Sequence, residues 1–225
     1  MTVTAIESVT RHKMRVSLDG EPAFVFTDRE IREWNLTEEM EFDRAEEEAL
    51  VQYVCREAAR TAMNLLVKRD YAQAELYRKL RERGYSEYFA RQGIAYVSSY
   101  HYLDDERYAR QMIGRYKGTA SRKMMMNKMK QKGLSDDVIR EVMEASEWTD
   151  EMGITRELHR RFSSAEQIEE MADKERQKLI QSLMRKGYGY GDITHVMRYF
   201  EEIDQERVYD WDFFHGIDFY KNDVR

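Results

Sequence analysis

A pattern of two large apolar residues and a glycine, each four positions apart, occurs three times in this chain. The glycines are 49 and 54 residues apart, and the copies are Leu76-Leu80-Gly84, Met125-Met129-Gly133 and Leu179-Leu183-Gly187. Apolar residues four positions apart share one helix face, and glycine ends helices because it adopts the left-handed conformation without a Cβ clash. The pattern predicts repeated helical units of about 50 residues.

The residues beside these glycines fit helix ends. A basic residue, suited to the negative end of the helix dipole, precedes each glycine: Arg83, Lys132 and Lys186. Two residues after the first two glycines, Ser86 and Ser135 are predicted N-caps of the next helices. Gly189 takes this place in the third copy, so the cap there is weaker or shifted to Asp192.

The first 27 residues predict strands instead. Met14, Val16 and Leu18 alternate with polar residues, and the turn dipeptide Asp19-Gly20 follows. Phe24 and Phe26 alternate on the return strand, and the run 3–9 offers a third strand. The only proline, Pro22, lies beside this turn and interrupts no helix.

A long helix is predicted after the N-cap Asp43. Three glutamates occupy its first turns, where the helix dipole favours negative charge: Glu46, Glu47 and Glu48. Its apolar stripe is formed by residues three or four apart: Val51, Val54, Ala58, Ala62 and Leu65.

The net charge of −6 hides an uneven distribution. Residues 56–133 carry 18 basic and 8 acidic residues, whereas residues 1–55 carry 6 and 13, and residues 134–225 carry 13 and 22. Such a basic block is either a solvated surface or a surface for an acidic protein or for phosphates. We expect partner binding by Arg78, Lys79, Arg81, Arg83, Arg115, Lys117, Arg122, Lys123, Lys128, Lys130 and Lys132.

The stretch Tyr102-Leu-Asp-Asp-Glu-Arg-Tyr-Ala109 lies between the first two glycine repeats, which end in Gly84-Tyr-Ser86 and Gly133-Leu-Ser135. This order resembles the RecX family, regulators of the bacterial RecA recombinase, over about residues 58–200. The residues that carry the resemblance are expected to be structural: Leu103, Asp104, Asp105, Arg107, Tyr108, Ala109, Gly84, Gly133 and Gly187.

The resemblance implies an all-α fold of three tandem three-helix repeats forming a curved, elongated solenoid, with a small N-terminal β-rich segment. We expect a β-hairpin-like segment with a short helix at 1–42. The repeats are expected at about 43–100, 101–147 and 148–202, within the range 43–202. An acidic aromatic tail at 203–225 could fold back on the basic middle of the chain.

The sequence gives no sign of an enzyme, a cofactor or a metal site. Asp104 and Asp105 are better explained as a helix N-cap with dipole-favoured acids, and Cys55 as a structural cysteine. The five histidines lack metal-ligand spacing. Neither a membrane span nor a secretory signal is evident, so we expect a cytoplasmic protein, and we expect a monomer.

The resemblance implies that the chain binds the RecA–DNA filament and inhibits its ATPase, growth and strand exchange in recombination, DNA repair and the SOS response. The alternative is a helical repeat protein that binds DNA or RNA directly, independently of RecA, through the same basic helices. Four tyrosines could stack on bases, although packing between helices is the commoner role of such residues: Tyr96, Tyr100, Tyr102 and Tyr108.

Overall fold

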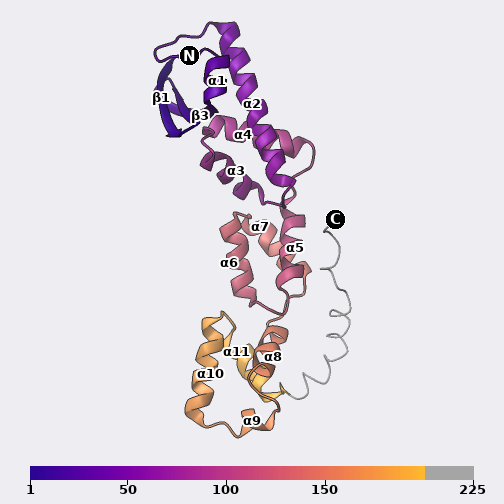
Figure 1. Ribbon diagram of the computed structural model, residues 1–225. Coiled ribbons are helices and arrows are strands. Elements are labelled where there is room, and N and C mark those ends of the chain that lie inside the picture. The colour runs from indigo at the N-terminus through magenta and orange to yellow at the C-terminus, as the bar shows by residue number, and fades with distance from the viewer. Residues whose placement is uncertain (201–225) are drawn as a thin grey trace, which may run out of the picture. The chain divides into compact units, whose positions relative to one another are not determined.

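The computed structural model describes residues 1–200, which are mostly helical and begin with a small β-sheet, as predicted (Figure 1). The acidic aromatic tail and the end of the third predicted repeat lie outside the described residues. The chain forms two compact units: Met1–Ala109 with Lys130–Val138, and Arg110–Met129 with the chain from Ile139 onward. The boundaries of the three repeats stay a prediction.

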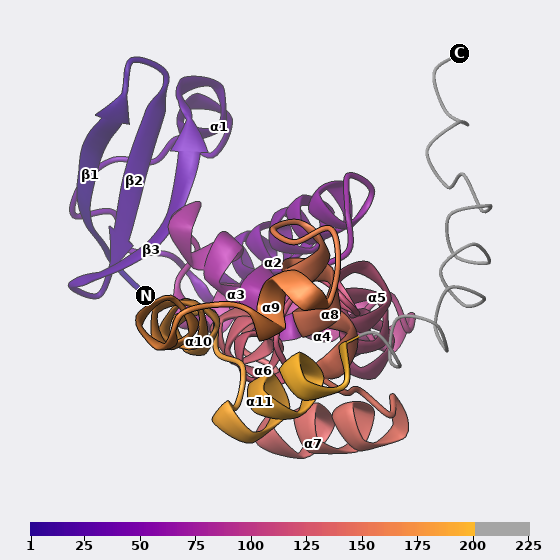
Figure 2. The same ribbon diagram turned by 90° about the horizontal axis from the view of Figure 1, so that it is seen from below.

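The N-terminal sheet consists of three antiparallel strands in sequence order, β1 (Val3–Thr10), β2 (Lys13–Leu18) and β3 (Glu21–Thr27), with the short helix α1 (Asp28–Glu33) beside them (Figure 2). Asp19 and Gly20 join β2 to β3 with φ values of 49° and 89°. Positive φ at both central residues is typical of the tight hairpin turn that matches strand twist. The predicted hairpin and third strand are therefore confirmed.

The sheet packs on the long helix α2 (Arg44–Leu66), and their shared core contains Val16, Phe24, Phe26, Leu50 and Val54. Asp43 caps α2 as predicted, because its carboxylate accepts a hydrogen bond from the Glu46 backbone and the Glu46 side chain accepts one from the Asp43 backbone. The buried stripe of α2 begins with Leu50, whereas the predicted Val51 is only half-buried.

The next helices are α3 (Gln73–Glu82), α4 (Glu87–Ser99), α5 (Asp105–Tyr116), α6 (Arg122–Lys132) and α7 (Asp136–Ala145). Helix α4 packs against α2, α3 and the core residues Ala62, Leu76 and Leu80. Gly93 permits the close approach of α4 to α2, because a Cβ there would lie 3.1 Å from the Ala58 backbone.

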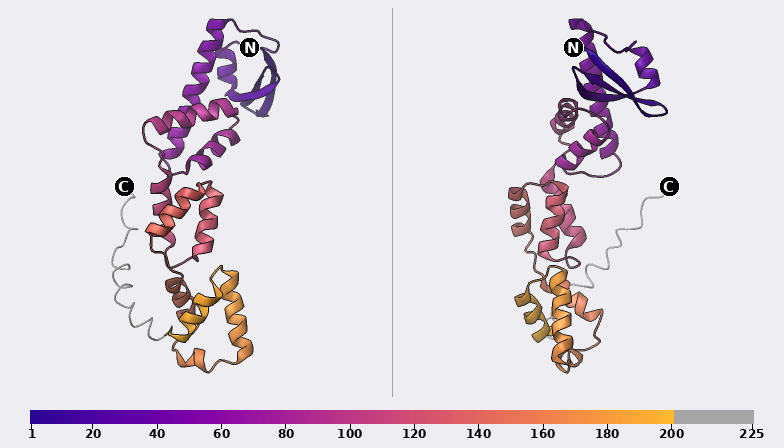
Figure 3. Two further views of the ribbon diagram at one scale, coloured as in Figure 1. Left: turned by 180° about the vertical axis from the view of Figure 1, so that it is seen from behind. Right: turned by 90° about the vertical axis from the view of Figure 1, so that its left-hand side faces the viewer.

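In the second unit, the orange to yellow helices of Figure 3 are α8 (Glu151–His159), α9 (Glu166–Glu169), α10 (Asp173–Arg185) and α11 (Tyr190–Arg198). Their core contains Ile154, Leu158, Leu179, Leu183 and Ile193. The short helix α9 is an additional element that the repeat pattern did not predict.

The three repeated glycines end their helices as predicted. Gly84, Gly133 and Gly187 have φ values of 93°, 89° and 93°. Ser135 caps the following helix, since its hydroxyl accepts a hydrogen bond from the Val138 backbone at 3.2 Å. Ser86 occupies the N-cap position of α4 as predicted, although its side chain makes no capping bond.

The third cap lies at Gly189, which precedes α11 and provides no side-chain capping bond. This agrees with the predicted weaker cap. The alternative position, Asp192, lies within α11 instead. Glycine has no side-chain acceptor, so the first backbone N–H groups of α11 receive no cap from this residue.

Each repeated glycine also touches a segment far away in the sequence. A Cβ on Gly84 would lie 2.3 Å from Val25 in β3, and one on Gly133 would lie 2.5 Å from the Cβ of Ala74 in α3. A Cβ on Gly187 would lie 2.5 Å from the hydroxyl oxygen of Ser121, which precedes α6. The glycines therefore both end helices and permit close packing.

Candidate binding surface on the basic helices

The predicted basic residues lie on α3, near the end of α5, and on α6. Leu76 and Leu80 lie on the buried face of α3, and Met125 and Met129 lie on the buried face of α6. The more exposed cations outside these faces are Arg78, Arg81, Arg83, Arg115, Lys117, Lys123 and Lys130. Lys79, Arg122, Lys128 and Lys132 are half-buried.

Several of these cations bond to backbone carbonyls. Arg81 donates to the carbonyl of Tyr85 at 3.0 Å, and Arg83 donates to that of Lys79 at 3.4 Å. In the second unit, Lys117 donates to the Ser146 carbonyl at 3.1 Å, and Arg122 donates to the Trp148 carbonyl at 3.4 Å. A carbonyl orients a cation without cancelling its charge, so these groups can still attract an anionic partner.

Other cations have carboxylate partners or an aromatic neighbour. Lys79 pairs with Glu82 at 2.6 Å, and Lys130 pairs with Asp136 at 2.7 Å. Lys128 lies 5.1 Å from the centre of the Tyr116 ring. Among the described residues, Arg115 and Lys123 make neither a hydrogen bond nor an ion pair through their side chains.

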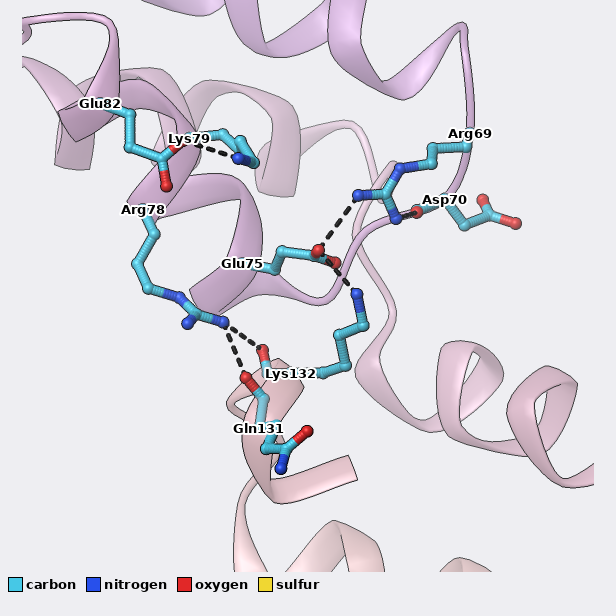
Figure 4. A network of polar contacts seen from close by, with 8 residues as sticks. All are labelled: Arg69, Asp70, Glu75, Arg78, Lys79, Glu82, Gln131 and Lys132. Carbon is cyan, nitrogen blue, oxygen red and sulfur yellow. Dashed lines mark hydrogen bonds and ion pairs between the residues drawn. The ribbon is translucent and has the colours of Figure 1, made fainter. Parts of the chain in front are cut away.

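Glu75 joins α3 to the end of α6 (Figure 4). Its Oε1 accepts from Arg69 at 3.0 Å and from Lys132 at 2.8 Å, and these two cations lower its pKa although its burial opposes this. Arg78 donates to the backbone carbonyl of Gln131 at 2.9 Å in the same contact. Arg78 and Lys132 therefore have a role within the molecule that the charge pattern alone did not predict.

The residues of the Leu-Asp-Asp motif make contacts within the described chain. Asp104 caps α5 as predicted, because its Oδ1 accepts from the Arg107 backbone at 2.8 Å. Leu103 packs against the α2–α4 core and Ala109 is buried. Tyr108 is half-buried beside Glu75 and Lys132, and burial raises its pKa.

Asp105 has a role that the sequence did not reveal. Its Oδ1 accepts a hydrogen bond at 2.8 Å from the backbone of Gln73, the first residue of α3, whose own N-cap Ala72 cannot provide one. In the second unit, Asp150 does the same for Arg122, the first residue of α6, at 2.6 Å. The signal in the sequence was an aspartate about 30 residues after each helix start.

Asp105→Asn is expected to keep the stability of the chain, whereas Asp105→Ala is expected to lose about 1 kcal/mol of unfolding free energy, because only asparagine retains an acceptor for Gln73. Burial raises the pKa of Asp105, so ionisation is disfavoured in the folded state. The part of the stability that depends on a protonated Asp105 is therefore fully present below the pKa of the unfolded chain and is lost as the pH rises through the raised folded pKa, so Asp105→Asn should equal the wild type in stability at low pH and exceed it at neutral pH. Urea unfolding at several pH values tests this, and equal losses in both variants would contradict it.

Three of the four tyrosines considered for base stacking are not packed between helices. Tyr96, Tyr100 and Tyr102 are 44%, 56% and 49% exposed, so the expectation of packing is wrong for them. The rings of Tyr96 and Tyr100 lie 5.1 Å apart between centroids, and those of Tyr100 and Tyr102 lie 5.9 Å apart at an interplanar angle of 19°. They are close enough to form one aromatic cluster on the surface.

His101 lies between two of these tyrosines and has a φ of 56°. It follows α4 in the position where glycine usually ends a helix, and this conformation is unfavourable for a residue with a Cβ. His101→Gly is therefore expected to raise the unfolding free energy by about 1 kcal/mol. Urea unfolding of the two proteins measures this, and a less stable glycine variant would show that the histidine side chain makes a compensating contact.

The match to protein families falls in the second unit. Residues 155–197, from α8 to α11, match the model of the third three-helix domain of RecX. The regulatory protein RecX of Vibrio campbellii is 30% identical over 145 residues, which cover 63% of this chain and 90% of the relative. This chain belongs to the RecX family.

Other RecX proteins match a larger part of the chain. The regulatory protein RecX of Clostridium botulinum strain Alaska E43 is 28% identical over 206 residues, covering 87% of this chain and 94% of the relative. The fold agrees with a crystal structure of regulatory protein RecX, with a TM-score of 0.55 and 19% identity over 86% of this chain and 98% of the other. The expected family and fold class are thus confirmed.

Residues 1–200 also bear on membrane-spanning and metal-binding classes. Within this range, no helix is long and apolar enough to cross a membrane. The same residues contain no group of three or more histidine, cysteine, aspartate or glutamate side chains that could hold a metal ion. Cys55 is half-buried, and burial raises the pKa of its thiol, which fits the structural role expected for it.

Proposed function

We propose that this RecX family member binds the RecA–DNA filament and inhibits its ATPase, growth and strand exchange. The observation that carries the proposal is the set of cations on and near α3 and α6 that bond to carbonyls and keep their charge, in a chain of this family. A filament presents DNA phosphates and acidic protein groups, both of which attract such cations.

The proposed mechanism requires no chemistry by this chain. A protein that binds one filament state more tightly shifts the balance between growth and shortening by occupancy alone. The principal proposed contacts are Arg81 and Arg83 at the C-terminal end of α3, Lys117 just after α5, and Arg122 at the start of α6. The chain acts in the cytoplasm as a monomer under this proposal.

The second candidate function is direct binding of DNA or RNA through the same cations. The two functions are separated by comparing affinities for RecA filaments, assembled on single-stranded DNA with a non-hydrolysable ATP analogue, and for the same DNA without RecA. Filament regulation predicts at least tenfold tighter binding to the filament at 150 mM salt. Equal or tighter binding to bare DNA, with a steep linear fall of log affinity against log salt, would favour the second function.

A further inference from the structure

The aromatic cluster of Tyr96, Tyr100 and Tyr102 is not used by the proposed contact with RecA. It lies at the C-terminal end of α4, whereas Arg81 and Arg83 lie at the C-terminal end of α3. The three tyrosines remain 44–56% exposed although their rings contact one another, so about half of each residue is accessible to solvent. Their free faces are therefore available to a ligand.

The backbone fixes the arrangement of these rings. The His101 N–H bonds to the Ser98 carbonyl at 2.9 Å, and the Tyr102 N–H bonds to the Val97 carbonyl at 3.1 Å. These two bonds and the positive φ of His101 reverse the chain after α4. The reversal places the Tyr102 ring nearly parallel to that of Tyr100, at 19°.

The cluster continues along the exposed face of α4. Tyr88, Gln92, Tyr96 and Tyr100 are four positions apart, so they form one stripe, and Tyr88 is 52% exposed. Beside this stripe, α2 and α4 border an open groove of about 500 Å³, lined among others by Arg56, Ala59, Met63 and Tyr96.

Two arginines line the groove that Tyr96 borders. Arg56 and Arg60 line the groove from α2, and Arg91 lies on α4. Glu57 pairs with Arg60 at 2.5 Å and Glu87 pairs with Arg91 at 2.6 Å, while Arg56 is exposed and has no carboxylate partner among the described residues. Arg56 therefore gives the groove a positive charge that no carboxylate among the described residues balances.

We propose that the aromatic cluster, with Arg56, is a stacking surface for single-stranded nucleic acid. Bases stack on aromatic side chains irrespective of sequence, and nearby guanidinium groups neutralise the phosphates. The nearly parallel rings favour this ligand over a protein, because they offer flat faces to a base. An aromatic anchor of a protein interface instead typically fills a pocket of the partner.

The test measures fluorescence anisotropy of labelled 20-residue oligothymidine and oligouridine with the full chain, in the absence of RecA. Tyr100→Ala/Tyr102→Ala is expected to weaken binding at least about tenfold, since each lost stack costs about that factor or more. Tyr100→Phe/Tyr102→Phe is expected to bind within about twofold of the wild type, because stacking requires the ring and not the hydroxyl.

Tyr190→Ala is the matched control, because Tyr190 is 60% exposed on α11 and lies outside the cluster. The stacking variant should leave the slope of log affinity against log salt unchanged, whereas Arg56→Glu should reduce it. Circular dichroism confirms that each variant is folded.

Wild-type affinity that is unmeasurable at 50 mM salt would overturn the proposal, as would an alanine variant that binds like Tyr190→Ala. An alanine variant that loses binding to RecA filaments while retaining oligonucleotide binding would identify the surface as a protein interface instead. Because the anisotropy assay contains no RecA, a failure to bind oligonucleotides leaves the proposed filament function intact. A failure to bind RecA filaments likewise leaves the proposed stacking surface intact.

Discussion

Gly133→Ala is expected to lower the unfolding free energy by about 3 kcal/mol, because the new methyl group meets two separate penalties. Gly133 has a φ of 89°, a conformation that alanine adopts at a cost of about 1–2 kcal/mol. The added Cβ would also lie 2.5 Å from the Cβ of Ala74, a group that cannot rotate away. Urea unfolding followed by circular dichroism measures the loss.

Three controls separate these two penalties. Gly20→Ala tests the backbone penalty alone, since Gly20 has a φ of 89° but nothing within 4 Å of a new Cβ. Gly114→Ala has neither penalty, because it lies within α5 in open space, and should stabilise the chain by about 0.5–1 kcal/mol. Adding Ala74→Gly to Gly133→Ala should restore about 1–2 kcal/mol of unfolding free energy, once the loss caused by Ala74→Gly alone has been subtracted. A Gly133→Ala loss no larger than that of Gly20→Ala would contradict the close contact.

The double charge reversal Arg81→Glu/Arg83→Glu is expected to weaken binding to RecA filaments at least about 100-fold, or about tenfold for each reversed contact. Both side chains are exposed and bond to backbone carbonyls, so reversal changes the charge of the surface without breaking an internal ion pair. Because glutamates replace cations at the negative end of the α3 dipole, the unfolding free energy should fall by about 1–2 kcal/mol, a small part of the stability of a folded domain. Sedimentation of the protein with preformed filaments gives the affinity.

The matched control exchanges the charges of a neighbouring ion pair. Lys79→Glu/Glu82→Lys keeps the net charge of α3 and allows the pair, now at 2.6 Å, to form in reverse. This variant should bind filaments within about threefold of the wild type. If both double variants bound like the wild type, α3 would not contact the filament.

The local features of the fold could be predicted from the sequence because they depend on neighbouring residues. Alternation around Asp19-Gly20 predicted the hairpin, Asp43 predicted the start of α2, and the glycines predicted helix ends, all through interactions within about four positions. Ser86 lies at the predicted N-cap position of α4, but its side chain makes no capping bond, and its backbone N–H bonds to the carbonyl of Ala23, which is distant in the sequence.

For the candidate site, the sequence predicted which residues are basic but not what each of them contacts. The basic helices were evident from charge, but which cations have carboxylate partners depends on contacts such as Lys132 with Glu75, 57 residues apart. Asp105 bonds to a helix start 32 residues earlier, and no local rule predicts this. The exposure of Tyr100 and Tyr102 likewise depends on the chain reversal at His101.

The ATPase activity of RecA on single-stranded DNA tests the central claim most directly. Rising concentrations of the wild-type chain are expected to reduce the rate until it levels off at saturation, and Arg81→Glu/Arg83→Glu should require about 100-fold more protein for the same reduction. An unchanged ATPase rate at saturating wild-type protein would contradict the account of this chain as a filament regulator.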